Sequence, residues 1–161
     1  MHPRAAELID IFQLERHPEG GYFREVFRSP HIITPSDTRG ARSVLTAIYF
    51  LLTAGEHSRW HRILSDEVWH FYEGDTAELF IIDKEKQHYT AVLLGHTGKS
   101  AKLMQVVPAG RWQAARTTGE YSLAGCTVAP GFEFDDFSLL SQFPEEETTI
   151  RRRFPELAAL M

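Results

Sequence analysis

The sequence predicts an all-β protein, an antiparallel sandwich or barrel with a short helix near each end. At least eight short runs are rich in β-branched and aromatic residues, and turn residues separate them at short intervals. One run, residues 43–53 (SVLTAIYFLLT), is apolar on both alternating faces. A strand with this pattern is covered on both sides, as in the middle of a sandwich or barrel.

The N-terminal part of the chain predicts a helix, a strand and a loop. Apolar residues recur at helical spacing from residue 4 to residue 14, which indicates a short helix packed on one face. Gly20-Gly21 ends this pattern, and residues 22–29 (YFREVFRS) are typical of a strand. Residues 30–42 contain two prolines and a glycine and predict a loop.

The remaining strands follow one another with short turns. They are expected at 67–73 (EVWHFYE), 77–83 (AELFIID), 88–95 (HYTAVLLG), 101–107 (AKLMQVV), 111–117 (RWQAART), 121–128 (YSLAGCTV) and 132–140 (FEFDDFSLL). Turns are expected at residues 74–75, 83–86 and 95–99. Residues 144–153 begin with proline and acids and end with arginines, which suits a helix and its dipole, and Pro155 is expected to end it.

Composition and charge exclude several classes of protein. The 161 residues suit a single domain, 1–161. The formal net charge of -5 argues against a nucleic-acid partner. No run approaches the length of a membrane span, and residues 1–14 lack the apolar core of a signal peptide. Cys126 is the only cysteine, so no internal disulfide forms, and a cytoplasmic location is the expectation.

Residues 57–75 concentrate histidines and acidic residues, and three geometries compete for them. A helical HSRWH segment would resemble the zincin spacing, but Ser58 stands where the catalytic glutamate belongs. Alternatively, two strands joined near residue 65 would let His61 and Glu67 meet across a ladder and point into an aromatic-walled interior. In the third geometry the histidines only pack or face solvent, and for His57 and His70 this interpretation is preferred.

The spacing in this region resembles the first cupin motif. That motif contains a glycine, a His-x-His pair, a glutamate and a closing glycine, and the matching residues are Gly55, His61, Glu67 and Gly74. Ile63 occupies the place of the second histidine. In the second cupin motif, a Pro-x-Gly precedes a histidine, and here Pro108 and Gly110 precede Gln113 instead.

The resemblance is closer to the cupin-5 group, most of whose members are uncharacterised. The matching stretches are HPEGGYFREVFRS, AIYFLL, HRILSDEVWHFYEGD, QVVPAGRWQAA and GCTVAPGFEFDDF, which together span most of the chain. The resemblance implies a jelly-roll cupin barrel (a double-stranded β-helix), a homodimer, and a pocket inside the barrel. It implies no particular reaction.

The residues at the motif positions predict no tightly held metal. Two good ligands, His61 and Glu67, would be joined only by the neutral carbonyl oxygen of Gln113, a poor partner for zinc, iron or copper. Weak binding of a divalent metal by these three residues is left open.

The leading hypothesis is therefore a pocket for a small molecule, and a carbohydrate-like one is suggested by a resemblance to metal-free cupin sugar-nucleotide epimerases. An isomerase or epimerase would use His61 as its base, with Glu67 and Gln113 orienting it or the substrate. Aromatic residues proposed for the walls are Trp69, Phe71, Trp112 and Tyr49. Two alternatives stay open: a ligand-binding cupin without catalysis, and a weakly metal-dependent enzyme that completes its ligands with His57 or His70.

Three further residues have expected roles near the site or in the core. Glu19 precedes a glycine pair that can bring backbone close to a ligand, so a lid or pocket-rim role is expected. Asp135 and Asp136 cannot face the same way on a regular strand, so Asp136 is expected to hold the turn or an arginine rather than form a carboxylate pair. Cys126 is expected to be a buried small hydrophobe.

Overall fold

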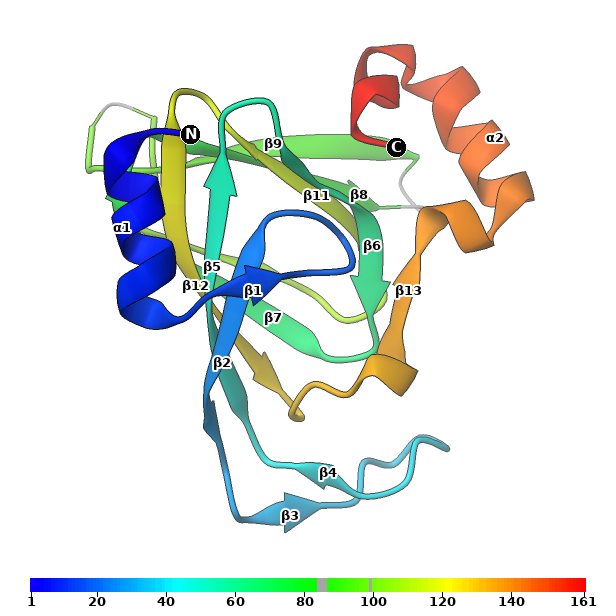
Figure 1. The fold of residues 1–161 in the computed structure, drawn as a ribbon. Coiled ribbons are helices and arrows are strands. Elements are labelled where there is room, and N and C mark those ends of the chain that lie inside the picture. The colour runs from blue at the N-terminus through cyan, green and yellow to red at the C-terminus, as the bar shows by residue number, and fades with distance from the viewer. Residues whose placement is uncertain (84–86, 99) are drawn as a thin grey trace.

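The structure is a computed structural model that describes residues 1–83, 87–98 and 100–161. Its body is a jelly roll of two antiparallel sheets that enclose a common interior (Figure 1). The larger sheet contains, in spatial order, β1 (Glu15–Arg16), β2 (Tyr22–Arg28), β5 (Thr46–Thr53), β12 (Tyr121–Ala129), β7 (Asp66–Gly74) and β10 (Met104–Val107). The smaller sheet contains β13 (Phe137–Leu139), β6 (His57–Ile63), β11 (Trp112–Thr117), β8 (Ala77–Asp83) and β9 (His88–Leu94). The prediction of an all-β jelly roll is confirmed.

Two short helices lie outside the sheets, as the sequence predicts. Helix α1 (Pro3–Phe12) begins with a proline and ends where Gln13 adopts a left-handed conformation, with φ of 52°. Helix α2 (Pro144–Arg153) carries its acids in the first turn and its arginines in the last. It ends before Pro155, and the 3-10 helix η3 (Pro155–Leu160) follows. None of the helices among the described residues is both long and apolar enough to cross a bilayer.

Apolar side chains are buried in three places. The barrel interior is filled by residues such as Phe50, Trp69 and Leu79 from both sheets. On the outer face of the smaller sheet, residues including Trp112 pack against α2 and the C-terminal segment. On the outer face of the larger sheet, α1 places Leu8 against β5 and β12. The helices thus cover the outside of the barrel and leave its interior to the site.

Two regions differ from the predicted elements, residues 30–42 and residues 132–140. Residues 30–42 are not all loop, because β3 (Ile32–Ile33) pairs with β4 (Arg42–Ser43) in an arm that projects from the barrel (Figure 1). Residues 132–140 are not one strand: the 3-10 helices η1 (Phe134–Asp136) and η2 (Leu140–Gln142) flank the short β13. Asp136 in this segment accepts a hydrogen bond from Arg42 of β4, and Phe132 contacts Phe134 within the segment. The expected turn at 83–86 lies largely outside the described residues.

Candidate functional site

The barrel interior contains a partly enclosed cavity of about 90 Å³ between the two sheets. Its walls come from the loop before β2, from strands β2, β5, β6, β7 and β12, and from the segment at residues 132–137. Four of the residues singled out in the sequence line it: Glu19, His61, Glu67 and Trp69. The cavity is therefore the place where the predicted polar residues converge.

His61 and Glu67 reach this cavity from opposite sheets, not across a ladder. The segment 57–74 does form two strands, so the helical zincin-like geometry is wrong. However, β6 pairs with β11 and β13, while β7 pairs with β12 and β10. The connection at residues 64–65 passes from one sheet to the other, so the two side chains face each other through the barrel interior.

A bulge in β6 turns both Ser58 and His61 into the barrel. Gln113 of β11 lies opposite His61, and Ala115 lies opposite Ser58, so two residues of β6 face the single residue between them on β11. Without the extra residue, an odd spacing along the strand would place the two side chains on opposite faces. Trp60 packs outward in the second core while the neighbouring His61 points inward, as adjacent residues of a strand do.

The hydrogen bonds of His61 assign its tautomer. Its Nδ1 atom lies 2.8 Å from the carbonyl oxygen of Arg59, which can only accept, so Nδ1 carries the proton and donates. The Nε2 atom then holds a lone pair. It lies 3.3 Å from Oε2 of Glu19, and Phe137 stacks on the ring with 5.6 Å between centroids. His61 is thereby presented as a neutral imidazole with a free proton acceptor.

The sequence predicted a lid or pocket-rim role for Glu19. In the structure Glu19 lies inside the cavity, with 5% of its surface exposed. Its Oε1 accepts a hydrogen bond from the Ser58 hydroxyl at 2.7 Å. The following residue, Gly20, has φ of 115°, and a Cβ there would overlap the carbonyl oxygen of His57. The glycine lets the loop press against β6, and this close approach turns the preceding carboxyl inward.

Burial shifts the pKa values of these groups toward their neutral forms. Desolvation lowers the pKa of His61 and raises the pKa of Glu19 to about 8, although the Ser58 hydrogen bond acts in the other direction on Glu19. Burial also lowers the pKa of His17 to about 3. Its Nδ1 accepts from the Glu19 backbone N–H at 3.3 Å, which agrees with a neutral ring. A protonated Glu19 carboxyl can thus donate to Nε2 of His61, in place of an ion pair.

Glu67 belongs to a second hydrogen-bonded group. The Gln113 amide N–H₂ donates to Glu67, while the Gln113 carbonyl oxygen accepts from the Trp69 indole N–H at 3.0 Å. The Cys126 thiol also bonds Glu67, and burial raises the pKa values of both groups. Gln113 itself is fully buried behind this group and does not line the cavity. It positions Glu67 and Trp69, and ligand contact by Gln113 would require a rearrangement.

Three aromatic residues expected in the walls lie elsewhere. Trp112 faces outward from β11, where its indole N–H donates to Glu146, because the strand alternates and Gln113 takes the inner face. Tyr49 points outward from β5 and packs on Phe12 of α1. Phe71 is in the interior core but away from the cavity, where its ring contacts His96.

The two histidines left open by the sequence also lie outside the cavity lining. His70 is on the outer face of β7, with its Nε2 3.4 Å from the Thr127 hydroxyl. His57 is half-buried at the start of β6, and its Nε2 has no hydrogen-bond partner among the described residues. Neither is placed to join His61 and Glu67.

The C-terminal wall of the cavity contains residues that the sequence did not single out for the site. Phe132, Phe134 and Phe137, here called the aromatic lip, have centroid separations of 5.1, 6.1 and 6.3 Å. The three phenylalanines of FEFDDF were visible in the sequence, but nothing there showed that η1 folds over the barrel mouth.

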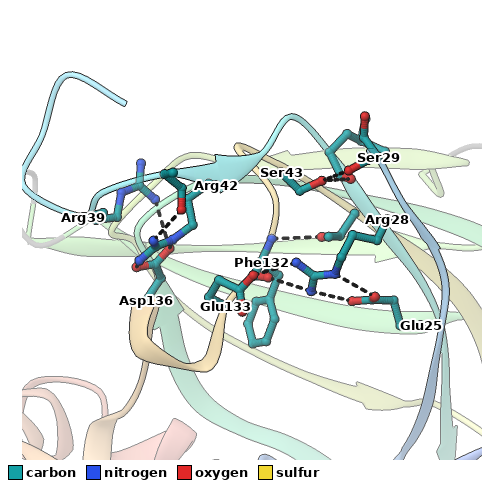
Figure 2. A network of polar contacts seen from close by, with 12 residues as sticks. Glu25, Arg28, Ser29, Arg39, Arg42, Ser43, Phe132, Glu133 and Asp136 are labelled. Carbon is teal, nitrogen blue, oxygen red and sulfur yellow. Dashed lines mark hydrogen bonds and ion pairs between the residues drawn. The ribbon is translucent and has the colours of Figure 1, made fainter. Parts of the chain in front are cut away.

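Two arginine clusters hold this segment in place (Figure 2). Arg28 of β2 bonds Glu25 and also Glu133, and it donates to the Phe132 carbonyl at 3.0 Å. Asp136 accepts two hydrogen bonds of 2.8 Å from Arg42, as expected for an aspartate that holds an arginine. The rim therefore ties β2, the arm and the aromatic lip together.

Comparison with protein families finds one family model that covers most of the chain. Residues 6–140 match the Cupin_5 model, described as "Cupin superfamily (DUF985)". The chain belongs to this family. The resemblance noted in the sequence is thereby confirmed, and the jelly roll of Figure 1 is a cupin barrel.

Three similar proteins match most of the chain. A hypothetical protein from Leishmania major is 33% identical, with a TM-score of 0.78 over 92% of this chain and 97% of that one. Protein SO0799 from Shewanella oneidensis is also 33% identical, with a TM-score of 0.76 over 91% and 94%. An uncharacterized protein of Saccharomyces cerevisiae, YML079W, is 27% identical over 83% of this chain and 74% of its own length. The names of these relatives assign no activity.

A more distant cupin shares the fold alone. Oxalate decarboxylase from Bacillus subtilis is 18% identical, with a TM-score of 0.60 over 91% of this chain and 36% of that one. The residues of the present cupin fit a metal poorly at the motif positions. Ile63 supplies no donor atom, and the Gln113 carbonyl oxygen, the one atom with which that residue could ligate, already accepts from Trp69. No group of three or more histidine, cysteine or acidic side chains among the described residues has a geometry that could hold a metal ion.

Proposed function

We propose that this cupin binds a small molecule in the barrel cavity and transfers protons on it without a metal, as an isomerase or epimerase of a carbohydrate-like substrate does. The observation that supports the proposal is the buried contact between Glu19 and His61, with 3.3 Å between Oε2 and Nε2. A free proton acceptor and a carboxyl of raised pKa stand side by side in an aromatic-walled cavity. A base with a lowered pKa beside an acid with a raised pKa is typical of acid–base sites.

The proposed chemistry is a proton shift next to a carbonyl group. His61 Nε2 accepts the proton from the carbon beside the carbonyl, and the Glu19 carboxyl donates its proton to the carbonyl oxygen as the C–H electron pair moves to form the enol. In an isomerase, His61 then returns the proton to the former carbonyl carbon, while the hydroxyl on the carbon that lost its proton gives its own proton to Glu19. The carbonyl group thereby moves to the neighbouring carbon, and the protein is left unchanged. The lowered pKa of His61 keeps it unprotonated and ready to accept at neutral pH, at the expense of basicity.

The other cavity residues then have supporting roles. The Ser58 hydroxyl and the Arg59 carbonyl hold the acid and the base in position. The second carboxyl, Glu67, is held by Gln113 and faces the pair through the cavity. The aromatic lip limits access of water, which strengthens polar interactions within the cavity.

Exchange of substrate protons with solvent tests this proposal. The protein is incubated in D₂O with a panel of aldoses, ketoses and keto-deoxy sugars, and deuterium at the carbon beside the carbonyl is followed by NMR. We expect exchange with at least one compound, and a loss on the order of 10² or more in His61→Ala. His70→Ala, a histidine on the outer face, is the matched control and should keep the wild-type rate.

A folded protein that binds panel members but exchanges no proton would overturn the enzymatic proposal in favour of a purely ligand-binding cupin. Equal loss of exchange in His61→Ala and His70→Ala would contradict the role given to His61.

A further inference from the structure

The cavity contains buried carboxyl groups without a buried cation. Glu19 and Glu67 are only 5% and 7% exposed, and both line the cavity. Among the described lining residues, Arg28 is the only arginine or lysine, and Glu25 and Glu133 already bind its guanidinium at the rim. Buried carboxyls are usually paired with a positive group, because an isolated buried charge is strongly unfavourable.

Neutral groups satisfy these carboxyls instead. Ser58 donates to Glu19, while Gln113 and Cys126 bond Glu67. The nearby imidazoles of His17 and His61 have lowered pKa values and do not provide a cation at neutral pH. The guanidinium of Arg59 bonds the backbone carbonyls of Pro18 and Glu19 and does not line the cavity. The positive charge that would balance the carboxyls is thus not supplied by the lining.

The rest of the lining is rich in aromatic side chains. Six rings contribute to it: Phe23, Phe50, Trp69, Phe132, Phe134 and Phe137. Ring faces carry a negative quadrupole and attract cations within about 6 Å of the centroid, most strongly when the cation is shielded from water. Carboxyls at the inner end and rings around the sides are the two features with which proteins recognise ammonium groups.

We infer that the cavity binds a small organic cation, whose ammonium group lies among the aromatic rings with Glu67 as its counter-charge. The inference rests on the proposed function in using the same cavity, and it narrows the substrate class: a carbohydrate-like substrate would carry an amino group. The modest volume, about 90 Å³, suits a compact head group rather than a nucleotide. A neutral polyol would use the hydrogen-bonding groups but would provide no positive group for Glu67 to pair with.

A pair of ligands that differ only in charge tests the inference on the unmodified protein. Choline and 3,3-dimethylbutan-1-ol have nearly the same shape, with nitrogen in the first replaced by carbon in the second. By isothermal titration calorimetry, we expect choline to bind at least about tenfold more tightly, since cation–π contact and a counter-charge act on it alone. Equal or tighter binding of the neutral alcohol, or binding of neither, would overturn the inference.

The Glu67→Gln variant assigns the counter-charge. It keeps the shape of the side chain and can still contact Gln113, so we expect choline affinity to fall roughly tenfold while affinity for the neutral alcohol stays unchanged. Glu78→Gln makes the same change on β8, outside the cavity lining, and should bind both ligands as the wild type does. Equal weakening of both ligands in a Glu67→Gln protein that keeps its melting temperature would contradict a charge-specific role.

The outcomes separate this inference from the proposed catalysis. Choline preference without proton exchange on any carbonyl compound would overturn the catalysis and support the cation site. Proton exchange on a neutral sugar, without a preference for choline over the neutral alcohol, would overturn the cation site and support the catalysis.

Discussion

Oε2 of Glu19 lies 3.3 Å from Nε2 of His61, and both side chains are buried. The two residues come from different elements, the loop before β2 and the bulged part of β6. Because Nδ1 of His61 is committed to the Arg59 carbonyl, Nε2 is the atom that can take a proton from Glu19 or from a ligand. The acid–base capacity of the cavity therefore depends on how one loop is placed against one strand.

The pH dependence of stability should differ between the wild type and Glu19→Gln. The pKa of Glu19 is about 8 in the folded protein and near 4.5 when the chain is unfolded. Between these values the folded state binds more protons than the unfolded state, so wild-type stability falls as pH rises. The variant lacks this loss. Its free energy of unfolding, relative to wild type, should rise by about 2 kcal/mol between pH 6.5 and 9, measured by urea denaturation.

The chosen pH window avoids the opposite effect of His17. Its pKa of about 3 makes the folded state bind fewer protons between pH 3 and 6.5, so this histidine increases stability as pH rises there. The other groups that face Glu19 within the site are His61, Glu67, Cys126 and Arg59. They are present in both proteins, so their contributions largely cancel in the difference. Parallel stability curves for the two proteins above pH 6.5 would contradict the placement of Glu19.

Gly20→Ala should disrupt the site much more than Gly40→Ala. Both glycines have positive φ, 115° and 80°, so both substitutions introduce backbone strain on the order of 1 kcal/mol. Only at Gly20 would the new methyl group also overlap the His57 carbonyl oxygen, whereas nothing lies within 4 Å at Gly40. We expect Gly20→Ala to lower the melting temperature further and to weaken ligand binding. Equal effects of the two substitutions would show that the close approach of the loop to β6 is not needed.

A complete metal site should form when both missing histidines are restored. Ile63 lines the cavity beside His61, and Gln113 pairs with His61 on the neighbouring strand. The double variant Ile63→His/Gln113→His would surround Glu67 with three imidazoles, a donor set that suits divalent transition metals. After soaking with nickel and desalting, we expect near-stoichiometric metal in the double variant and little in the wild type. Stoichiometric retention by the wild type would contradict the interpretation of Gln113 as a positioning residue.

Asp136→Asn should loosen the aromatic lip. Asp136 is buried and receives two hydrogen bonds from Arg42 and a longer contact from Arg39 (Figure 2). Removing its charge leaves the largely buried Arg42 side chain without the carboxylate that it binds, so we expect the melting temperature to fall by about 5 °C. Asp135→Asn, an exposed position one residue earlier, is the control and should change it little. Faster quenching of tryptophan fluorescence by acrylamide, reporting access to Trp69, should accompany the loss only in Asp136→Asn.

Much of the fold follows from local patterns in the chain. The short runs of apolar, aromatic and β-branched residues at 77–83 and 121–128 predict β8 and β12 closely, because such side chains pack well on a pleated surface. Proline, acids and arginines at the expected positions likewise bound α2. Residues 132–140 are different. Phe132 and Phe134 have the spacing of a strand, but the segment continues into η1, where Asp136 forms an ion pair with Arg42 of the arm.

The candidate site was only partly predictable. Motif spacing identified His61 and Glu67, which line the cavity together with Trp69, one of the aromatics proposed for its walls. The proposal for Trp112 was wrong, because Gln113 takes the inner face of β11 and strand alternation turns the neighbouring indole outward. The pairing of Glu19 with His61 was also hidden, because it needs both the glycine-dependent turn and the bulge in β6.

By itself, the sequence determined the all-β class, the bounding helices and the chemical types available at the motif positions, including the isoleucine and glutamine that replace histidines. These properties depend on residue type and on spacing within single elements. The tertiary structure decided which carboxyl contacts His61, which rings form the cavity wall and which residues are only structural. Those outcomes depend on how two sheets, one loop and the rim segment approach one another, and such long-range approaches leave no periodic signal in the chain.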